Sequence, residues 1–472
     1  MTIDRDHPYI INPLDHGGHA DCFVADYPNL FRFSATRGWL VYQDGFWGNE
    51  GAEASIGRGV EKMLRARKKM IPQYIEDEAI QKAMKRLCVV SASQVNSIKT
   101  LLKSRKEIEL KSTALDTHIT LFNCKNGVVD LETGKLLPHA ARYLFTHRAE
   151  VDYDPDAADT NWRTFLDSLG MSPEVLEYLR RVAGYALTGL TDEEVMFYLY
   201  GATRTGKGTF TNALLGVMGQ YSMGINFRTF TVRRDGDTQN FDLAILAPKR
   251  FLSASESKRN ERINSSVFKQ VTGGDPVFAS LKGKDGFSFI PQWKVMLSSN
   301  YPLNADPMDA AVWARVNVIR FNDSKLGKED KTLKRKLSSD DARKAILAWA
   351  VSGAVDWHKS GLEVPKEITI NTRRMRLEAS SVLLFIDQCC KLMVDSTSDG
   401  KALYAAYVEW AIGEGYKPFG RTSFTQSLEQ VGCYGGVRKQ SGKATRYYTH
   451  IEFAGDSMGD QSISNRIEVG IF

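Results

Sequence analysis

The alternation of short apolar runs with helical segments between residues 194 and 321 is the feature that most constrains the fold. Segments with helical spacing, such as TFTNALLGVM (209–218) and INSSVFKQVTG (263–273), separate the runs VMFYLY (195–200), RFLSAS (250–255), KVMLSSN (294–300) and VNVIRF (316–321). Parallel strands need a crossover connection, which is usually a helix. The alternation therefore predicts an α/β core with a parallel sheet.

The first apolar run leads into a loop with the spacing G-x-x-x-x-G-K. Glycines let backbone N–H groups wrap phosphates, the following helix N-terminus adds a favourable field, and the lysine reaches the terminal phosphates. The bare spacing arises by chance in roughly one chain in five of this length, so the flanking strand and helix favour it over a structural glycine turn. We predict an ATP site formed by Gly201, Ala202, Thr203, Arg204, Thr205, Gly206, Lys207, Gly208 and Thr209.

The residue after the lysine departs from the usual pattern, because it is Gly208 and not serine or threonine. The hydroxyl that ligates Mg²⁺ is therefore missing from its standard position. Thr209 could replace it, or a water could fill that coordination position. The sequence leaves both open and predicts Mg²⁺ ligation by Thr209 and Glu256.

Residues at the ends of the later strands complete the predicted site. Glu256 follows RFLSAS and could polarise the attacking water, with Ser255 in place of the usual aspartate. Asn300 ends the next run, where an amide could orient that water. For both, a solvated strand-end side chain is the alternative. Arg315 precedes the last run and is the candidate arginine finger, with Arg320 as its rival.

The order of these features resembles the superfamily 3 helicases, and most closely the helicase half of the phage and plasmid primase-helicases, a group that includes the poxvirus primase-helicase. The resemblance covers roughly residues 10–455, and its most specific stretch contains the signature Thr272-Gly273-Gly274-Asp275. It implies that Glu256 is the Walker B acid and Asn300 is sensor 1. It also implies an AAA+-like hexameric ring on DNA, with Arg315 supplied across the subunit boundary.

The segment 277–290 reads as a β-hairpin with a basic tip. In the rings that the chain resembles, such a hairpin projects into the central channel. Lys282 and Lys284 would then contact the phosphates of single-stranded DNA. The alternative is a solvated turn that carries two lysines.

The last 95 or so residues read as two helices followed by a basic hairpin around Ser441-Gly442, which suggests a winged-helix module. Its predicted DNA contacts are Arg438, Lys439, Lys443 and Arg446. The alternative is a ring-packing domain with an exposed basic surface. The expected domains are an N-terminal α+β region (1–115), a pre-helicase domain (116–190), the ATPase core (191–345), a helical connector (346–375), the winged-helix-like domain (376–455) and a tail (456–472).

Composition narrows the class of protein. A hydrophobic share of 43% and a charged share of 25% exclude a mainly disordered or collagenous chain. No apolar run approaches membrane-spanning length and no secretion signal opens the chain, so we expect a protein of the bacterial host cytoplasm with no membrane partner. Six scattered cysteines favour reduced thiols. Residues 58–111 hold 14 Lys and Arg against 6 Asp and Glu, which suits a polyanion or a solvated helix face.

Two weaker patterns compete with these interpretations. His16, His19 and Cys22 have a metal-like spacing, although the segment resembles one that the family carries without metal. Asp130 and Glu132 resemble a primase acidic pair, but a companion histidine or third acid is lacking in a suitable frame. We expect no fused primase, and hence a separate primase or other replication proteins as partners.

The sequence thus predicts an ATP-dependent helicase of phage, prophage or plasmid replication, a ring with ATP and Mg²⁺ between subunits that acts on single-stranded and forked DNA. Two alternatives remain open. One is a P-loop ATPase that remodels or loads replication proteins without unwinding, and the other is a DNA-binding replication regulator that only senses nucleotide.

Overall fold

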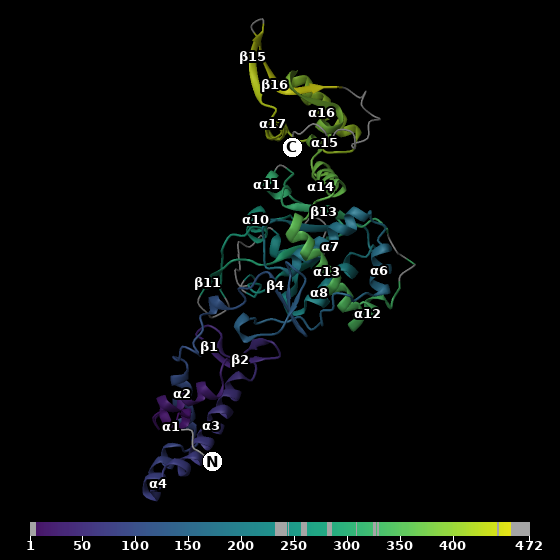
Figure 1. The fold of residues 1–472 in the computed structure, drawn as a ribbon. Helices are drawn as coiled ribbons and strands as arrows, with labels where there is room; N and C mark the ends of the chain where they lie inside the picture. The colour runs from purple at the N-terminus through teal and green to yellow at the C-terminus, as the bar shows by residue number, and fades with distance from the viewer. Residues whose placement is uncertain are drawn as a thin grey trace.

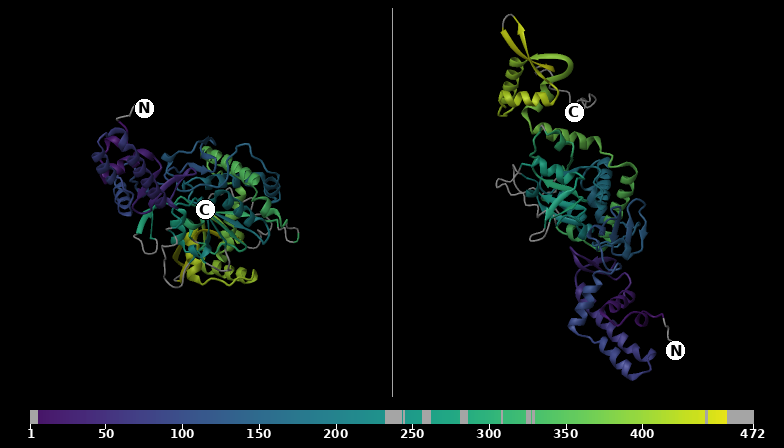
Figure 2. Two further views of the ribbon diagram at one scale, coloured as in Figure 1. Left: turned by 90° about the horizontal axis from the view of Figure 1, so that it is seen from below. Right: turned by 90° about the vertical axis from the view of Figure 1, so that its left-hand side faces the viewer.

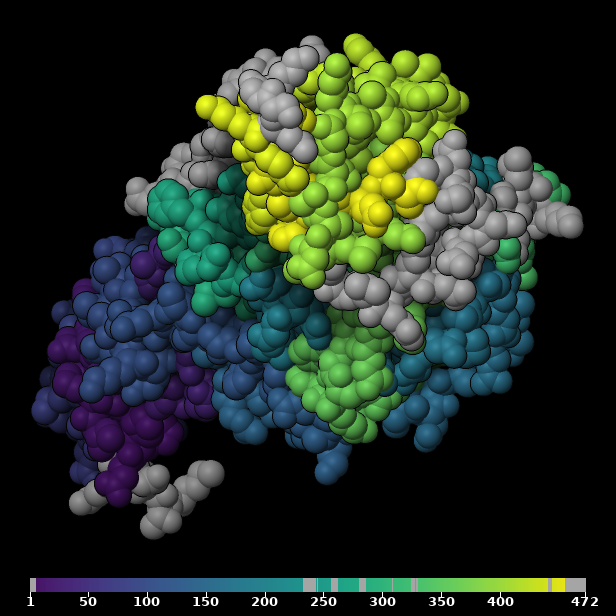
Figure 3. Space-filling model, turned by 90° about the horizontal axis from the view of Figure 1, so that it is seen from above, coloured from purple at the N-terminus to yellow at the C-terminus, as the bar shows by residue number. Residues whose placement is uncertain are grey.

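The computed structural model describes the backbone of residues 6–231, 243, 245–255, 262–280, 286–307, 309–323, 327, 330–440 and 443–454, and their side chains except those of residues 280, 440 and 443. Three parts follow one another along an elongated molecule: an N-terminal part, a central part built on a parallel sheet, and a C-terminal part (Figure 1). Figure 2 shows the same order from the side. From above, the N-terminal part extends beyond the outline of the centre (Figure 3).

The N-terminal part combines a small antiparallel sheet with helices, as the sequence predicts. Asp15, Asp77 and Ser91 cap three of these helices, each side chain accepting a backbone N–H of the first turn. The elements are α1 (Pro8–Ile11), α2 (His16–Asp26), β1 (Phe31–Ser34), β2 (Gly38–Gln43), β3 (Phe46–Gly48), α3 (Ala52–Tyr74), α4 (Glu78–Leu87) and α5 (Ala92–Leu102).

A second antiparallel sheet and two helices precede the parallel sheet. In this sheet β4 pairs with β5 on either side of the turn Lys125-Asn126, and β5 pairs with β6. Ser172 caps the helix that Pro173 begins. The elements are η1 (Ser112–Ala114), β4 (Leu121–Cys124), β5 (Gly127–Asp130), β6 (Leu136–Leu137), η2 (Ala141–Tyr143), α6 (Thr160–Asp167) and α7 (Pro173–Leu187).

The predicted parallel sheet is confirmed, and it has five strands in the order β13-β7-β12-β9-β8. The strands are β7 (Met196–Tyr200), β8 (Ser222–Asn226), β9 (Phe251–Ser255), β12 (Lys294–Ser299) and β13 (Val316–Arg320). The described elements around them are α8 (Lys207–Met218), η3 (Gly219–Tyr221), η4 (Phe227–Phe230), α10 (Ser265–Thr272), β10 (Val277–Ser280), β11 (Gly286–Phe289), α11 (Ala310–Trp313), α12 (Leu333–Lys336), α13 (Asp340–Ser360) and α14 (Lys366–Glu378).

Each face of the sheet has its own hydrophobic core, because side chains alternate between the faces along a strand. Phe197 and Leu199 of β7 pack with residues of α7, α8 and α13. Met196 and Tyr198 of the same strand pack with residues of α10 and α11. The first core extends from Phe122 to Ile368, so it crosses the boundaries that we predict at 190/191 and 345/346.

Helices α7 and α13 lie side by side with their backbones almost in contact. A Cβ on Gly184 would clash with the backbone N of Ala354, and a Cβ on Gly353 would clash with the carbonyl of Arg180. Only glycine permits so close an approach. One helix precedes the sheet in the sequence and the other follows it, so the central part includes both.

The C-terminal part forms its own hydrophobic core. A three-stranded sheet of order β14-β16-β15 packs on three helices, and the predicted hairpin is β15 paired with β16. The first strand of this sheet is not among the elements that we predict. The elements are α15 (Ser381–Cys389), β14 (Cys390–Asp399), α16 (Gly400–Gly413), α17 (Arg421–Gln430), β15 (Gly435–Gln440) and β16 (Lys443–Phe453).

Two sequence expectations concern the chain as a whole. Among the described residues, no helix combines the length and the apolarity needed to cross a lipid bilayer. All six cysteines are buried, and none is paired with another.

Candidate functional site

The carboxyl ends of the parallel strands bring the predicted ATP-site segments to one edge of the sheet. In the strand register, Tyr200 at the end of β7 lies opposite Ser299 of β12 and Arg320 of β13. Ser298 of β12 lies opposite Ser255 of β9. The loop 201–206 and Asn300 follow directly, so they meet at this edge. Ligands of open parallel sheets bind in this place.

The loop between β7 and α8 turns sharply through two residues in the left-handed region. The φ angle is +65° at Arg204 and +98° at Gly206. A Cβ on Gly206 would also approach the Leu169 side chain, so glycine is required for both conformation and space. The turn places Lys207 at the first position of α8, directly after the loop.

Lys207 lies inside the loop, with only 7% of its surface exposed. Its Nζ donates to the carbonyls of Gly201 and Ala202, both at 2.7 Å, and to Thr205 Oγ1 at 3.2 Å. Loss of hydration through burial lowers the pKa of its ammonium group. No carboxylate among the described residues pairs with Lys207. Within the described part of the chain, dipoles alone compensate its positive charge, which suits exchange for an anionic ligand.

Asn300 is the residue from another strand that contacts this lysine. Its Oδ1 accepts a hydrogen bond from Lys207 Nζ at 3.0 Å, and its Nδ2 donates to Thr203 Oγ1 at 3.3 Å. The amide thus connects the end of β12 to both ends of the loop. The structure brings together Lys207 and Asn300, which are 93 residues apart in the sequence.

The two threonines near the start of α8 differ in their surroundings. Thr211 Oγ1 donates to the carbonyl of Lys207 at 3.2 Å, so it is used inside the helix. Thr209, two residues closer to the loop, is half-buried. A Cβ on Gly208 would meet no atom within 4 Å, so the absent serine or threonine is not excluded by space. Hydroxyl and carbonyl oxygens near the loop suit Mg²⁺, which prefers oxygen ligands.

The two candidate arginines lie at opposite edges of the sheet. Arg320 ends β13 at the loop edge, where its guanidinium lies 5.4 Å from the centre of the Tyr200 ring. Arg315 precedes β13 and so lies at the amino edge, about 16 Å away for a five-residue strand. There its Nη2 donates to Glu194 Oε2 at 2.5 Å, and its Nη1 to the carbonyl of Ala311 at 3.2 Å. Arg315 therefore cannot reach the loop of its own chain.

Three predicted site residues lie outside the described residues: Glu256 after β9, and Lys282 and Lys284 at the tip of the β10–β11 hairpin. The hairpin strands themselves are described. Phe278 is 59% exposed, and its ring lies across Gly286, where a Cβ would clash with it. The hairpin thus carries an exposed aromatic ring that the sequence interpretation missed.

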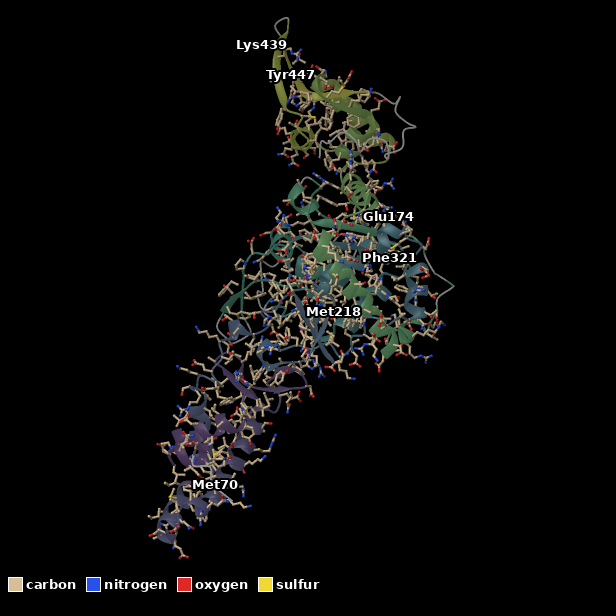
Figure 4. The ribbon with its side chains drawn as sticks, in the orientation of Figure 1. Met70, Glu174, Met218, Phe321, Lys439 and Tyr447 are labelled. Atoms are coloured by element: carbon tan, nitrogen blue, oxygen red, sulfur yellow. The ribbon has the colours of Figure 1, made fainter. Side chains whose placement is uncertain are left out.

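The cations of the C-terminal hairpin divide between its faces. Arg438 lies opposite Thr445 and its guanidinium is 4.7 Å from the centre of the Tyr447 ring, whereas Arg446 lies opposite Val437 on the other face. Lys439 lies near the hairpin tip (Figure 4). The side chain of Lys443 lies outside the described residues, although its backbone pairs with Gln440.

The weaker sequence patterns meet other partners. His19 Nδ1 lies 2.9 Å from the buried Arg67 Nη1, and Cys22 Sγ donates to the carbonyl of Pro8. Burial lowers the pKa of His19 to about 4. Asp130 Oδ1 accepts the backbone N–H of Glu132 in a turn. In the described part of the chain, no group of three or more His, Cys, Asp or Glu is placed to hold a metal.

Two buried cations at the amino edge of the sheet were not predicted from the sequence. Arg250 donates to the carbonyls of Leu121 and Leu187, both at 2.8 Å, and of His118 at 3.1 Å. Lys294 donates to the carbonyls of Thr188, Leu190 and Gln292. Burial lowers the pKa of Lys294 well below its usual value, and the nearby Arg250 adds to the effect.

Two known protein families match the chain, one before the site and one over the segment that carries the loop, Asn300 and Arg315. Residues 20–169 match a family described as D5 N terminal like, and residues 199–315 match a family of unknown function, DUF5906. Together the two matches cover more than half of the chain.

Two curated viral relatives, both named only as candidate helicases, also match. One, from Acanthamoeba polyphaga mimivirus, is 26% identical over 322 residues, covering 63% of this chain and 33% of the relative. The other, from Frog virus 3 (isolate Goorha), is 24% identical over 254 residues, covering 49% of this chain and 26% of the relative. These matches support a phage-type primase-helicase family for the chain.

This chain spans a third or less of the length of these two relatives. Among solved structures, apo forms of the NrS-1 C terminal region are similar at 12–14% identity. One covers 77% of this chain and 91% of that chain with a TM-score of 0.44, and another covers 66% and 80% with a TM-score of 0.42. The support for this family therefore comes from the sequence matches.

Proposed function

We propose that the protein is an ATP-dependent DNA helicase that works as a ring in replication, with ATP bound between neighbouring subunits. The observation that carries the proposal is the separation of Lys207 and Arg315 on opposite edges of one sheet. An arginine that stabilises the transferring phosphoryl group must reach it directly. Arg315 can do so only in the loop of a second copy, which favours a head-to-tail ring.

In this proposal each subunit contributes two half-sites. Lys207 exchanges its carbonyl partners for the terminal phosphate oxygens of ATP, and Asn300 holds the water that attacks the γ-phosphate. Arg315 of the next subunit stabilises the charge that develops on the transferring group. Thr209 and Glu256 are the residues proposed to hold Mg²⁺, which would neutralise charge on the phosphates.

The proposed DNA contacts follow the family pattern. Lys282 and Lys284 at the hairpin tip would hold the phosphates of single-stranded DNA inside the ring, and a hairpin base with an exposed Phe278 adds a surface on which a base can stack. Arg438, Lys439, Lys443 and Arg446 would contact duplex DNA through a winged-helix-like domain. The order helix, strand, helix, helix, strand, strand from α15 to β16 supports this part of the proposal.

Mixing two inactive variants tests the shared site. Lys207→Ala and Arg315→Ala should each abolish DNA-stimulated ATP hydrolysis. Equal amounts mixed before assembly should recover about a quarter of the wild-type rate, because random mixing pairs an intact loop with an intact arginine at a quarter of the interfaces. A mixture of Lys207→Ala with Arg320→Ala is the control. Since Arg320 lies at the loop edge of its own chain, that mixture should recover nothing if Arg320 is needed.

Failure of the first mixture to recover activity, with co-assembly shown by sedimentation, would contradict the shared site. A forked-duplex assay then separates the functions. ATP hydrolysis without strand separation would indicate a remodelling or loading ATPase, and nucleotide binding without hydrolysis would indicate a nucleotide-sensing regulator.

A further inference from the structure

Helix α4 forms the tip of the N-terminal part, at the end of the molecule farthest from the parallel sheet (Figure 1). None of its residues is buried. Polar contacts hold it in place: Gln81 Nε2 donates to the carbonyl of Ile75 at 2.7 Å, and the carbonyl of Leu87 accepts Gln94 Nε2 at 2.8 Å. The helix is thus anchored while Ile80, Ala83 and Leu87 stay exposed.

The apolar stripe of α4 faces solvent. Ile80, Ala83 and Leu87 are three and four residues apart, so they share one face of the helix. Ile80 is 51% exposed and Leu87 is 50% exposed, and Val89 directly after the helix is 45% exposed. A surface helix normally turns such a stripe towards the core. The preceding helix α3 does this with Ile56, Val60 and Leu64, which are fully buried.

A basic stripe adjoins the apolar one. Lys82 and Arg86 are one turn apart, and Arg86 is three residues from Ala83, so the two stripes touch. With Lys68 of α3 and Lys85, they line an open groove of about 510 Å³ that contains one carboxylate, Glu78. Among the described residues, Lys68, Lys82 and Arg86 form no ion pair.

We infer that α4 is a docking site for an amphipathic helix of a partner protein whose polar face is acidic. A partner that buries the apolar stripe must present apolar side chains to it. It must also carry carboxylates beside those side chains, where they can pair with the adjoining cations. An amphipathic acidic helix supplies both at one helical spacing. A nucleic acid would satisfy the cations only, because the stripe is aliphatic and offers no aromatic ring for base stacking.

Peptide binding to the full chain tests this docking site. The probe is a fluorescent 18-residue helical peptide with leucines at positions i, i+3, i+4 and i+7 and glutamates at the positions that border this leucine face, read by anisotropy. It should bind at least about tenfold more tightly than a counterpart with lysine at every glutamate position. Leu87→Ser and Arg86→Glu should each weaken binding about tenfold. Ile412→Ser, which changes a residue of α16 that is 64% exposed, should leave it unchanged.

Three outcomes would overturn the inference. In the first, the two peptides bind equally well or neither of them binds. In the second, an oligothymidine displaces the acidic peptide, which would assign the patch to nucleic acid. In the third, Ile80→Asp would dissociate an oligomer in sedimentation, which would assign the stripe to contacts between copies. ATP hydrolysis should persist in the α4 variants, so failure here is distinguishable from failure of the proposed ATPase.

Discussion

The two edges of the parallel sheet carry the same kinds of cation for opposite purposes. At the carboxyl edge, Lys207 is held by two carbonyls of the loop that precedes it and by Asn300. At the amino edge, Arg250 and Lys294 are held by carbonyls of the segment 118–121 and of residues 187–190, which belong to the preceding sheet and helix.

The two groups of cations differ in whether a ligand could replace their hydrogen-bond acceptors. The acceptors of Lys207 belong to the loop where phosphate would bind, so a ligand can replace them at little cost. The acceptors of Arg250 and Lys294 lie between packed elements, so removal of either cation leaves carbonyls there without the hydrogen bond that it donates. Charge at one edge is therefore suited to ligand binding, and charge at the other joins two parts of the molecule.

The largest expected effect belongs to the carboxyl edge. Lys207→Met should lower kcat for ATP hydrolysis by about 10³-fold, because a donor to the transferring phosphoryl group is lost. The unfolding temperature should change little. Lys249→Met is the matched control, since burial also lowers the pKa of that lysine while its Nζ contacts only the carbonyl of Gln220. A similar loss of activity in both variants would contradict the assignment.

The amino edge should show the reverse pattern. Arg250→Met should lower the free energy of unfolding by about 3 kcal/mol, because the carbonyls of Leu121 and Leu187 lose their side-chain donor and the carbonyl of His118 loses one of its two donors. Chemical denaturation measures this change. Arg343→Met, which removes one hydrogen bond to the carbonyl of Gly216 at an exposed position, should change stability by less than about 0.5 kcal/mol. Equal effects of the two would show that Arg250 does not join the parts.

The contribution of Lys294 to stability at the amino edge should depend on pH. Its pKa is lower in the folded chain than its usual value of 10.5, so the unfolded chain binds more protons between the two values. Stability contributed by Lys294 should therefore rise with pH towards 10.5, by at most about 1.4 kcal/mol per pH unit. The stability difference between wild type and Lys294→Met, followed by denaturation from pH 7 to about 10, measures this. A difference that is flat or falls with pH would refute it.

The smallest expected effect concerns the missing hydroxyl. Gly208→Ser should lower the Mg²⁺ concentration for half-maximal ATP hydrolysis about threefold, because it restores a ligand at the usual position. Space is available there, and Gly216→Ser on the same helix, also with no atom within 4 Å of its Cβ position, is the control. No change in either would favour Thr209 or water as the ligand.

The sequence predicts the carboxyl edge well because one physical rule governs it. Four apolar runs with parallel connections must end at the same edge, so the loop and Asn300 had to meet. The fifth strand, β8, was not predicted, because its sequence SMGIN contains a glycine and two polar residues. It becomes a strand by pairing with β9 alone, at the border of the sheet.

The amino edge and α4 could not be predicted for a different reason. The acceptors of Arg250 lie 63 to 132 residues away, and nothing local in the sequence shows which carbonyls need a donor. The periodicity of α4 is visible in the sequence. However, periodicity alone assigns an apolar stripe to the core, and only the polar anchoring by Gln81 shows that the stripe faces outward.

The close contact of α7 and α13 has a consequence for synthesis of the chain. Helix α7 ends at residue 187, and α13 begins only at residue 340. At the usual rate of translation, α7 emerges roughly 10–30 s before its partner exists. Throughout that time its apolar face is uncovered, so the nascent central part is a substrate for chaperones until α13 leaves the ribosome.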